Sequence, residues 1–153
     1  GFGTALTAMV ATNMGAGNAK RALRVAWLGA AIVAAITGGI GLTTAIAPAL
    51  WMNLFTQDAA VREFGASYLR IVGACYGLYG FGLALFFASQ GAGRMFWPLA
   101  GSVARLVIVA LGGWVCVHVL QTSASGFFVV VAASLGLYGL IIAAAIKFGS
   151  WAR

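Results

Sequence analysis

Three long stretches of this sequence, residues 25–57, 71–93 and 106–146, contain no Asp, Glu, Lys or Arg. A helix needs about 20 apolar residues, each adding about 1.5 Å, to cross the hydrocarbon core of a bilayer. The first two stretches each suffice for one span. The third is long enough for two, and the polar cluster QTSASG at residues 121–126 interrupts it. These stretches predict helices that cross a membrane.

The composition supports this prediction. Of the 153 residues 63% are hydrophobic and only 7% are charged, too few to form an ordinary water-soluble surface. Alternation of apolar and polar residues is absent, which disfavours a barrel of strands. We predict an all-α, polytopic transmembrane helix bundle. It should contain the end of one helix near residues 1–16 and four full spans near residues 25–50, 68–90, 98–120 and 126–146.

The cations predict the orientation of the bundle. If the spans alternate in direction, one side of the membrane receives Lys20, Arg21, Arg24, Arg94, Lys147 and Arg153. The other side receives Arg62, Arg70, Asp58 and Glu63. Because cytoplasmic loops carry an excess of Lys and Arg, the first side and the C-terminus should be cytoplasmic. Cations so scattered among apolar runs argue against a nucleic-acid partner, despite the net charge of +7.

Two similar glycine motifs stand at predicted cytoplasmic helix ends: NMGAGNAKR at residues 13–21 and SQGAGR at residues 89–94. Gly15 and Gly17 belong to the first, and Gly91 and Gly93 to the second. A phosphate-binding loop would need a preceding strand, and neither nucleotide motif is completed. Helix ends with tight turns are the better interpretation, since glycine accepts the left-handed conformation.

Four polar residues within the predicted spans are candidates for a transport pathway. Tyr76 and Tyr79 are three residues apart and share a helix face, which can line a cavity for a cationic, aromatic guest. Ordinary helix contact is the competing interpretation. Gln90 either caps its own helix or faces a cavity. Arg105 lies well inside its span, where it either extends to the headgroups or faces water.

Other polar chemistry is sparse. The predicted spans hold no Asp or Glu, so an ion-coupled carrier would need its carboxylate elsewhere. The single His118 and the two cysteines, Cys75 and Cys116, form no catalytic or metal-binding pattern. We therefore expect neither an enzyme nor a metal site.

Small residues indicate where helices meet. Gly73, Gly77, Gly80 and Gly82 allow close approach of one helix face to another in lipid. The sequence GLYG occurs at residues 77–80 and 136–139, and with 22 glycines in the chain we attribute this recurrence to chance.

Three longer segments together resemble the C-terminal lobe of multidrug and toxic compound extrusion (MATE) transporters. They are GTALTAMVATNMGAGNAKRA, YLRIVGACYGLYGFGLALFFASQGAGR and MFWPLAGSVARLVIVALGGW. The resemblance covers essentially the whole chain. It implies a twelve-helix transporter of two six-helix lobes, of which this chain would supply the end of the eighth helix through the twelfth.

The resemblance also implies a function: export of organic, often cationic, compounds in exchange for protons or sodium ions, by alternating opening of a cavity between the lobes. Family members often carry an acid in the helix that matches residues 68–90, and this chain has none there, so the coupling site should lie outside it. The expected partners are the lipid bilayer, the missing N-terminal lobe and small organic cations. The expected location is a bacterial inner membrane.

Two alternatives remain open at this point. The same architecture can serve a flippase for a lipid-linked precursor, as in related proteins. From a different class, the bundle can be a non-transporting membrane scaffold whose glycine faces assemble partners.

Overall fold

Seven helices make up the computed structural model of residues 1–149 and 151, the part of the chain that the structure describes, which contains no β-strand. They are α1 (Phe2–Gly15), α2 (Ala19–Ile46), α3 (Pro48–Met52), α4 (Ala59–Gly73), α5 (Tyr76–Gly91), α6 (Phe96–His118) and α7 (Ala124–Lys147). The predicted all-α class is confirmed.

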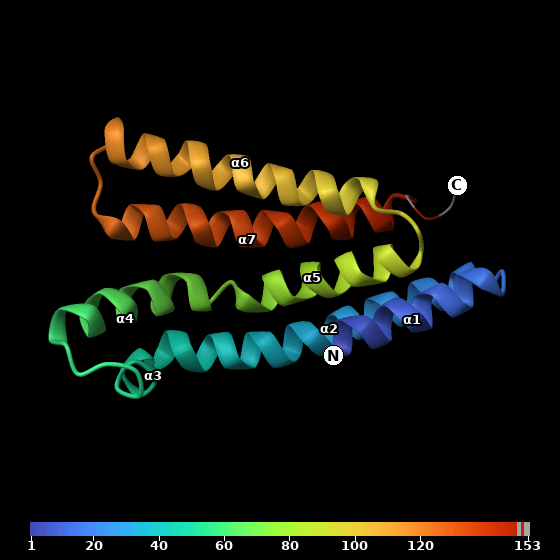
Figure 1. Ribbon diagram of the computed structural model, residues 1–153, viewed down its shortest axis with the longest axis horizontal. Helices are drawn as coiled ribbons and strands as arrows, with labels where there is room; N and C mark the ends of the chain where they lie inside the picture. Colours follow the sequence, from blue (N-terminus) through green and yellow to red (C-terminus); the bar gives the residue numbers. More distant parts are fainter. Residues whose placement is uncertain (150, 152–153) are drawn as a thin grey trace.

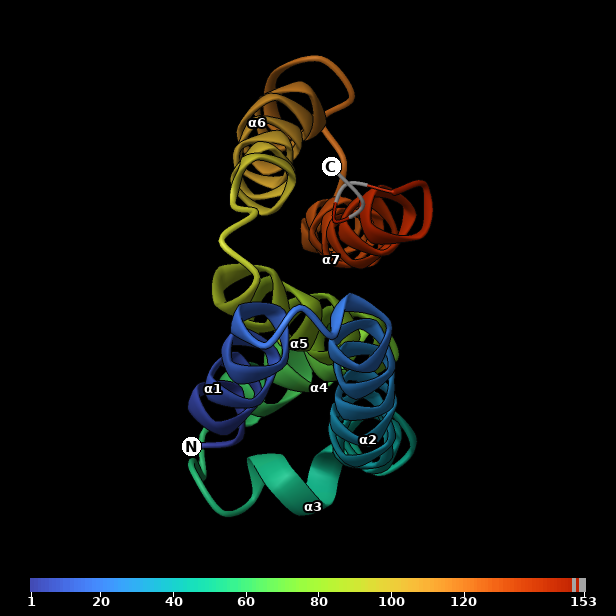
Figure 2. The same ribbon diagram turned by 90° about the vertical axis from the view of Figure 1, so that its right-hand side faces the viewer.

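The long helices run roughly along one axis (Figure 1). Seen along that axis, α5 lies in the middle, with α1 and α2 on one side of it and the hairpin of α6 and α7 on the other (Figure 2). The contacts agree with this view, because α5 packs against α1, α2 and α7, whereas α6 packs chiefly against α7.

Among the described residues, α2, α6 and α7 are each long and apolar enough to cross a membrane. The pair α4 and α5 passes the same criterion only when taken together, so the number of spans is three, or four if this bent pair counts as one. Four spans and the end of another, α1, match the predicted bundle. Helices α6 and α7 lie within about two residues of their predicted bounds.

Helix α2 differs from the predicted span at both ends. It starts at Ala19, because Lys20, Arg21 and Arg24 continue the helix beyond the uncharged stretch. It ends at Ile46 and not near residue 50, because Ala47 precedes Pro48 and adopts φ −127°, ψ 60°. Proline disfavours the helical conformation in the residue before it, and here it opens the short α3.

The span predicted at residues 68–90 begins nine residues earlier and is broken. Helix α4 starts after Asp58, whose carboxylate oxygen accepts hydrogen bonds from the backbone N–H groups of Ala60 at 2.8 Å and Val61 at 3.2 Å. Residues 74 and 75 separate α4 from α5, and the two helices meet at a bend of 58°. Uncharged stretches do not reveal this start, because α4 carries Arg62 and Glu63 near its outer end.

Glycines bring α2 close to the bent span. A Cβ atom added to Gly41 would press on the carbonyl oxygen of Gly73, and one added to Gly77 would lie 3.1 Å from the Cα of Gly38. One added to Gly80 would press on the hydroxyl of Thr37. We call this contact between α2 and the span α4–α5 the glycine seam. It confirms the close approach predicted from the spacing of small residues.

The two GLYG segments lie against each other. A Cβ atom added to Gly139 would press on the carbonyl oxygen of Leu78, and the rings of Tyr79 and Tyr138 are tilted against each other with centroids 5.9 Å apart. The recurrence of GLYG, which we attribute to chance, therefore coincides with a contact between α5 and α7.

The connections at the two ends of the bundle separate the charges as predicted, except that Arg70 lies in the last turn of α4, next to the break and away from the outer end. The turns α1–α2 and α5–α6 and the end of α7 lie at one end, and the connections α3–α4 and α6–α7 lie at the other (Figure 1). The first end, called here the basic end, carries Lys20, Arg21, Arg24, Arg94 and Lys147. Arg153, which we also assigned to it, lies outside the described residues.

Candidate functional site

A cleft of about 400 Å³ opens beside the break at residues 74 and 75, between α2, the bent span and the α6–α7 hairpin. Its lining residues come from five helices and are Thr37, Ile40, Tyr68, Tyr76, Tyr79, Arg105, Val131 and Leu135. A volume of this size is typical of small-molecule sites. The cleft thus brings together three of the four predicted pathway residues, Tyr76, Tyr79 and Arg105.

Arg105 and Tyr79 are in direct contact across the cleft. The guanidinium carbon of Arg105 stands 5.0 Å from the centroid of the Tyr79 ring, within the range of a cation–π interaction. The ring of Tyr138, which is buried on α7, packs against the ring of Tyr79. Of the two interpretations left open for Arg105, this contact favours a side chain that turns into the cleft.

The fold around Tyr76 and Tyr79 explains their orientation. In α5 the glycines at 77 and 80 meet α2 at the glycine seam, whereas Tyr76 and Tyr79 line the cleft. Because a Cβ atom at Gly80 would clash with Thr37 and one at Gly77 would be crowded against Gly38, the rotation of α5 about its axis is restricted. The tyrosines consequently project from a constrained backbone.

The break between α4 and α5 lies next to the cleft, since Tyr76 is the first residue of α5. No side chain caps the start of this helix. Within a membrane, backbone that leaves the helical pattern is tolerated where protein buries it or where it lines a water-filled cavity. The position of the break fits the second situation.

Sequence reasoning missed the lining residues that come from other helices. Tyr68 precedes the break, and its ring stands edge-on to Phe128, with centroids 5.3 Å apart. Thr37, Ile40, Val131 and Leu135 complete the walls. Tyr138 carried one available signal, because it occupies in the second GLYG the place that Tyr79 has in the first.

Gln90 lies apart from the cleft. It is exposed near the last turn of α5, about 21 Å along the helix axis from Tyr76 at about 1.5 Å per residue. The structure therefore does not group it with the other three candidates.

The four motif glycines lie at helix ends. Gly15 and Gly91 are the last residues of α1 and α5, and Gly17 and Gly93 follow with φ of 73° and 68°. These positive φ values are the left-handed turns expected of glycine after a helix. Gly91 also packs against the backbone of Thr7, which ties α5 to α1.

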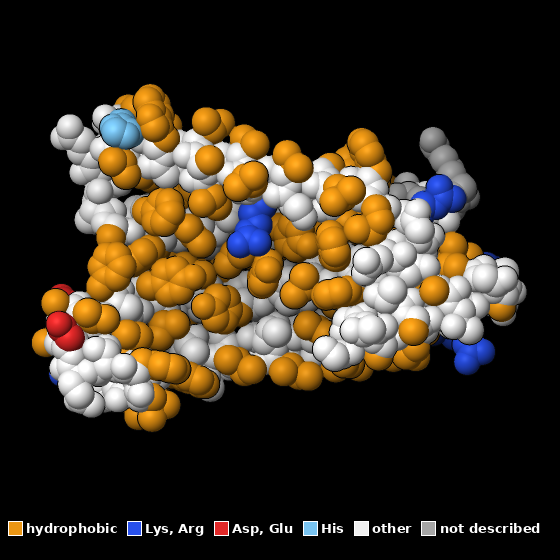
Figure 3. Space-filling model, viewed as in Figure 1, with side chains coloured by type: hydrophobic (Ala, Val, Ile, Leu, Met, Phe, Trp, Pro, Cys, Tyr) orange, Lys and Arg blue, Asp and Glu red, His pale blue; other side chains and the backbone are white. Residues whose placement is uncertain are grey.

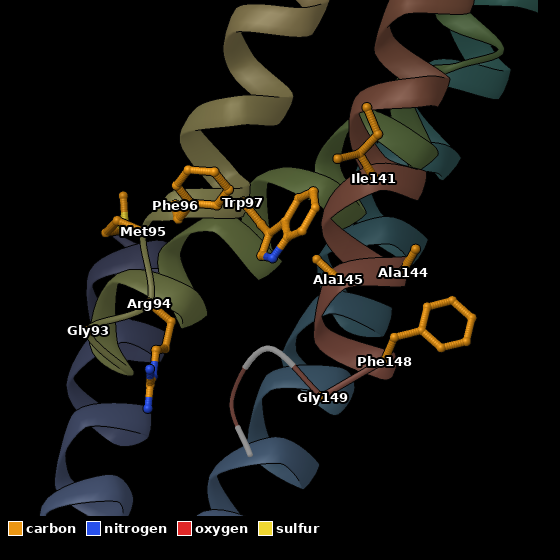
Figure 4. Close-up of a pocket in the computed structure, with 10 residues that line it drawn as sticks. All are labelled: Gly93, Arg94, Met95, Phe96, Trp97, Ile141, Ala144, Ala145, Phe148 and Gly149. Atoms are coloured by element: carbon orange, nitrogen blue, oxygen red, sulfur yellow. The ribbon is translucent and has the colours of Figure 1, made fainter. Parts of the chain in front are cut away.

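Two further pockets lie at the basic end. One, of about 770 Å³, lies between the α5–α6 turn and the end of α7, where Trp97 points toward α7 and Arg94 points away from it (Figure 4). The second, of about 800 Å³, is lined by residues 17–21, Arg24, Val25 and Leu28. Both combine cations with the ends of helices, which suits contact with lipid headgroups better than enclosure of a guest.

The surface of the bundle is largely apolar between its ends. Figure 3 shows hydrophobic side chains over most of one face, acidic ones at the end opposite the basic end, and a cationic patch midway. On α6, Leu106 and Leu111 are 68% and 62% exposed. Such a surface suits lipid. The described residues contain no group of three or more His, Cys, Asp or Glu side chains that could hold a metal ion.

Comparison with known proteins gives one match. Residues 1–115, which extend from α1 through most of α6, match the family model MatE. No curated protein and no solved structure matches the chain. The matched segment contains Tyr68, Tyr76, Tyr79 and Arg105, and it ends before α7.

Proposed function

Because this chain belongs to the MatE family, which is a family of transporters, we propose that it forms part of a secondary antiporter that exports organic compounds in exchange for protons or sodium ions. The family and the apolar helices make it an integral membrane protein, and the family is not one of enzymes. The compounds expected from the resemblance are drugs or toxins, often cationic.

The observation that carries the proposal is the cleft beside the broken span. It lies beside the break at residues 74 and 75, and transporters typically form their cargo sites from discontinuous helices of this kind. Aromatic rings and one cation line it, so it offers stacking and charge to a small organic guest. A scaffold needs neither a cleft nor a charge at this depth.

The proposed partners follow from the same features. The α6–α7 hairpin and the exposed faces of α2 contact lipid, and a second lobe of the same protein faces the cleft and closes it. We place the basic end on the cytoplasmic side of a bacterial inner membrane. Asp58 and Glu63, the only acids of the chain, do not line the cleft, so we assign the coupling carboxylate to the other lobe.

Transport assays on the full-length protein test this function. Inside-out membrane vesicles that contain it should accumulate a fluorescent organic dye when protons or sodium ions are more concentrated in the vesicle lumen than outside, and dissipating that gradient with an ionophore should stop accumulation. Vesicles without the protein provide the background. Equal accumulation with and without a proton or sodium gradient would contradict antiport, and accumulation at background for dyes of either charge would contradict transport.

A further inference from the structure

Arg105 is a cation held in the middle of an apolar bundle. It lies about 13 Å along α6 from Phe96 at about 1.5 Å per residue, and its side chain is half-buried. Its guanidinium is packed over the ring of Tyr79 and lines the cleft. The charge therefore faces the space that a guest would occupy.

No anion among the residues that the structure describes balances that charge. Within residues 1–149 and 151, the Arg105 side chain forms no hydrogen bond and no ion pair with a carboxylate. The two acids lie toward the outer end, where Asp58 caps α4 and Glu63 is exposed one turn later. Because the effective dielectric constant beside protein is lower than that of bulk water, a positive charge in the cleft wall attracts an anion more strongly than it would in water.

The tyrosines in the cleft wall indicate further chemical features of the guest. Tyr68, Tyr76 and Tyr79 offer ring faces for stacking and phenolic O–H groups that can donate hydrogen bonds. Arginine matches carboxylate and sulfonate groups with its fork of N–H donors. A second cation would meet repulsion, because the face of Tyr79 is already occupied by Arg105.

We propose that the cleft binds an organic anion: an aromatic compound that carries a carboxylate or sulfonate group, with the acid on Arg105 and the ring among the tyrosines. This inference rests on the proposed function and assigns its cargo a charge opposite to the cationic class that the resemblance favours.

Two xanthene dyes of similar size and opposite charge provide the test: carboxyfluorescein, an anion, and rhodamine 6G, a cation. Binding to the full-length protein in nanodiscs is measured by fluorescence polarisation, separately from any ion gradient. Carboxyfluorescein should bind at least about tenfold more tightly than rhodamine 6G. Tighter binding of rhodamine 6G, or binding of neither dye, would overturn the proposal.

Variants locate the effect at Arg105. R105Q should weaken carboxyfluorescein about tenfold or more without weakening rhodamine 6G, and R105K, which keeps the charge, should retain part of the anion affinity. R94Q removes an exposed cation outside the cleft and serves as the matched control. An equal loss of both dyes in R105Q and R105K would identify Arg105 as a structural residue and overturn the proposal. If R105Q does not fold, R105K with unchanged anion selectivity supports it and R105K with reversed selectivity overturns it.

The outcomes separate this inference from the proposed function. Gradient-driven transport of rhodamine 6G alone would preserve the antiporter and remove the anion assignment. Tight binding of carboxyfluorescein without any gradient-driven transport would preserve the site and remove the antiporter.

Discussion

The two sides of α5 differ at the same depth of the bundle: one packs closely against α2, and the other lines the cleft. Toward α2, the glycine seam brings backbones so close that a Cβ atom added to Gly77 would stand 3.1 Å from the Cα of Gly38. Toward the hairpin, Tyr76 and Tyr79 reach into a cleft of about 400 Å³. Close association of helices requires small side chains, whereas guest binding requires large ones. The three-residue spacing along α5 lets one helix supply both kinds.

A large residue in the seam should have the largest effect. Gly41→Leu must displace the Gly73 carbonyl and the Cβ of Tyr76, and such overpacking should lower the free energy of unfolding by at least about 3 kcal/mol. Thermal unfolding of the detergent-solubilised protein, followed by size-exclusion chromatography, measures it. Gly39→Leu on the same helix enters open space and should behave as wild type. Similar melting of both variants would mean that the seam is not closely packed.

The two cysteines should differ in their access to water. Cys75 lies half-buried at the break beside the cleft, whereas Cys116 is buried on α6. A water-soluble maleimide should therefore label Cys75 roughly tenfold faster, because thiol modification requires access and the ionised form. Single-cysteine variants C75A and C116A in native membranes give the two rates. Equal rates would show that water does not reach the break.

Bulk on the cleft side should cost function rather than folding. Ile40 lines the cleft directly beside Gly41 in sequence and is 49% exposed. Ile40→Trp should reduce dye binding several-fold and change the free energy of unfolding by less than about 1 kcal/mol, as for substitutions outside packed regions. Ile36→Trp, one turn away and outside the cleft lining, is the control. Unfolding of Ile40→Trp would place this residue in the packed region instead.

The smallest effect should come from the outer end. Asp58→Ala removes the side-chain acceptor for the N–H groups of Ala60 and Val61 and should cost about 1 kcal/mol of stability. Asp58→Asn keeps a capping oxygen and should lose much less. Thermal unfolding of the two variants measures the difference, and an Ala variant as stable as wild type would show that α4 does not depend on this cap.

Much of the bundle follows from uncharged stretches, because lipid accepts only helices of sufficient length. The predicted helix bounds were wrong where the edge of an uncharged stretch is not the end of a helix. Lys20 and Glu63 lie inside helices, and α2 ends before Ala47 because a proline follows that residue. The break at residues 74 and 75 has no proline to announce it.

Sequence reasoning selected the tyrosine pair and the cation separately and did not place them together. Tyr76 and Tyr79 share a face that spacing reveals, and Arg105 stands out because charge is costly in lipid. Tyr68 and Val131 join them through the bend and through the packing of α7, which depend on contacts between distant segments. Gln90 was grouped with them on polarity alone.

The bend of 58° at Ala74 and Cys75 divides one crossing of the membrane into two helices, α4 toward the outer end and α5 toward the basic end. Helix α5 packs against α1, α2 and α7, and α4 packs against α2, α3 and α7. Because Tyr68 belongs to α4 and Tyr76 and Tyr79 belong to α5, a change in this bend would shift the tyrosines of the cleft relative to one another. The bend of the span thus lies beside the cleft in which the proposed guest would bind.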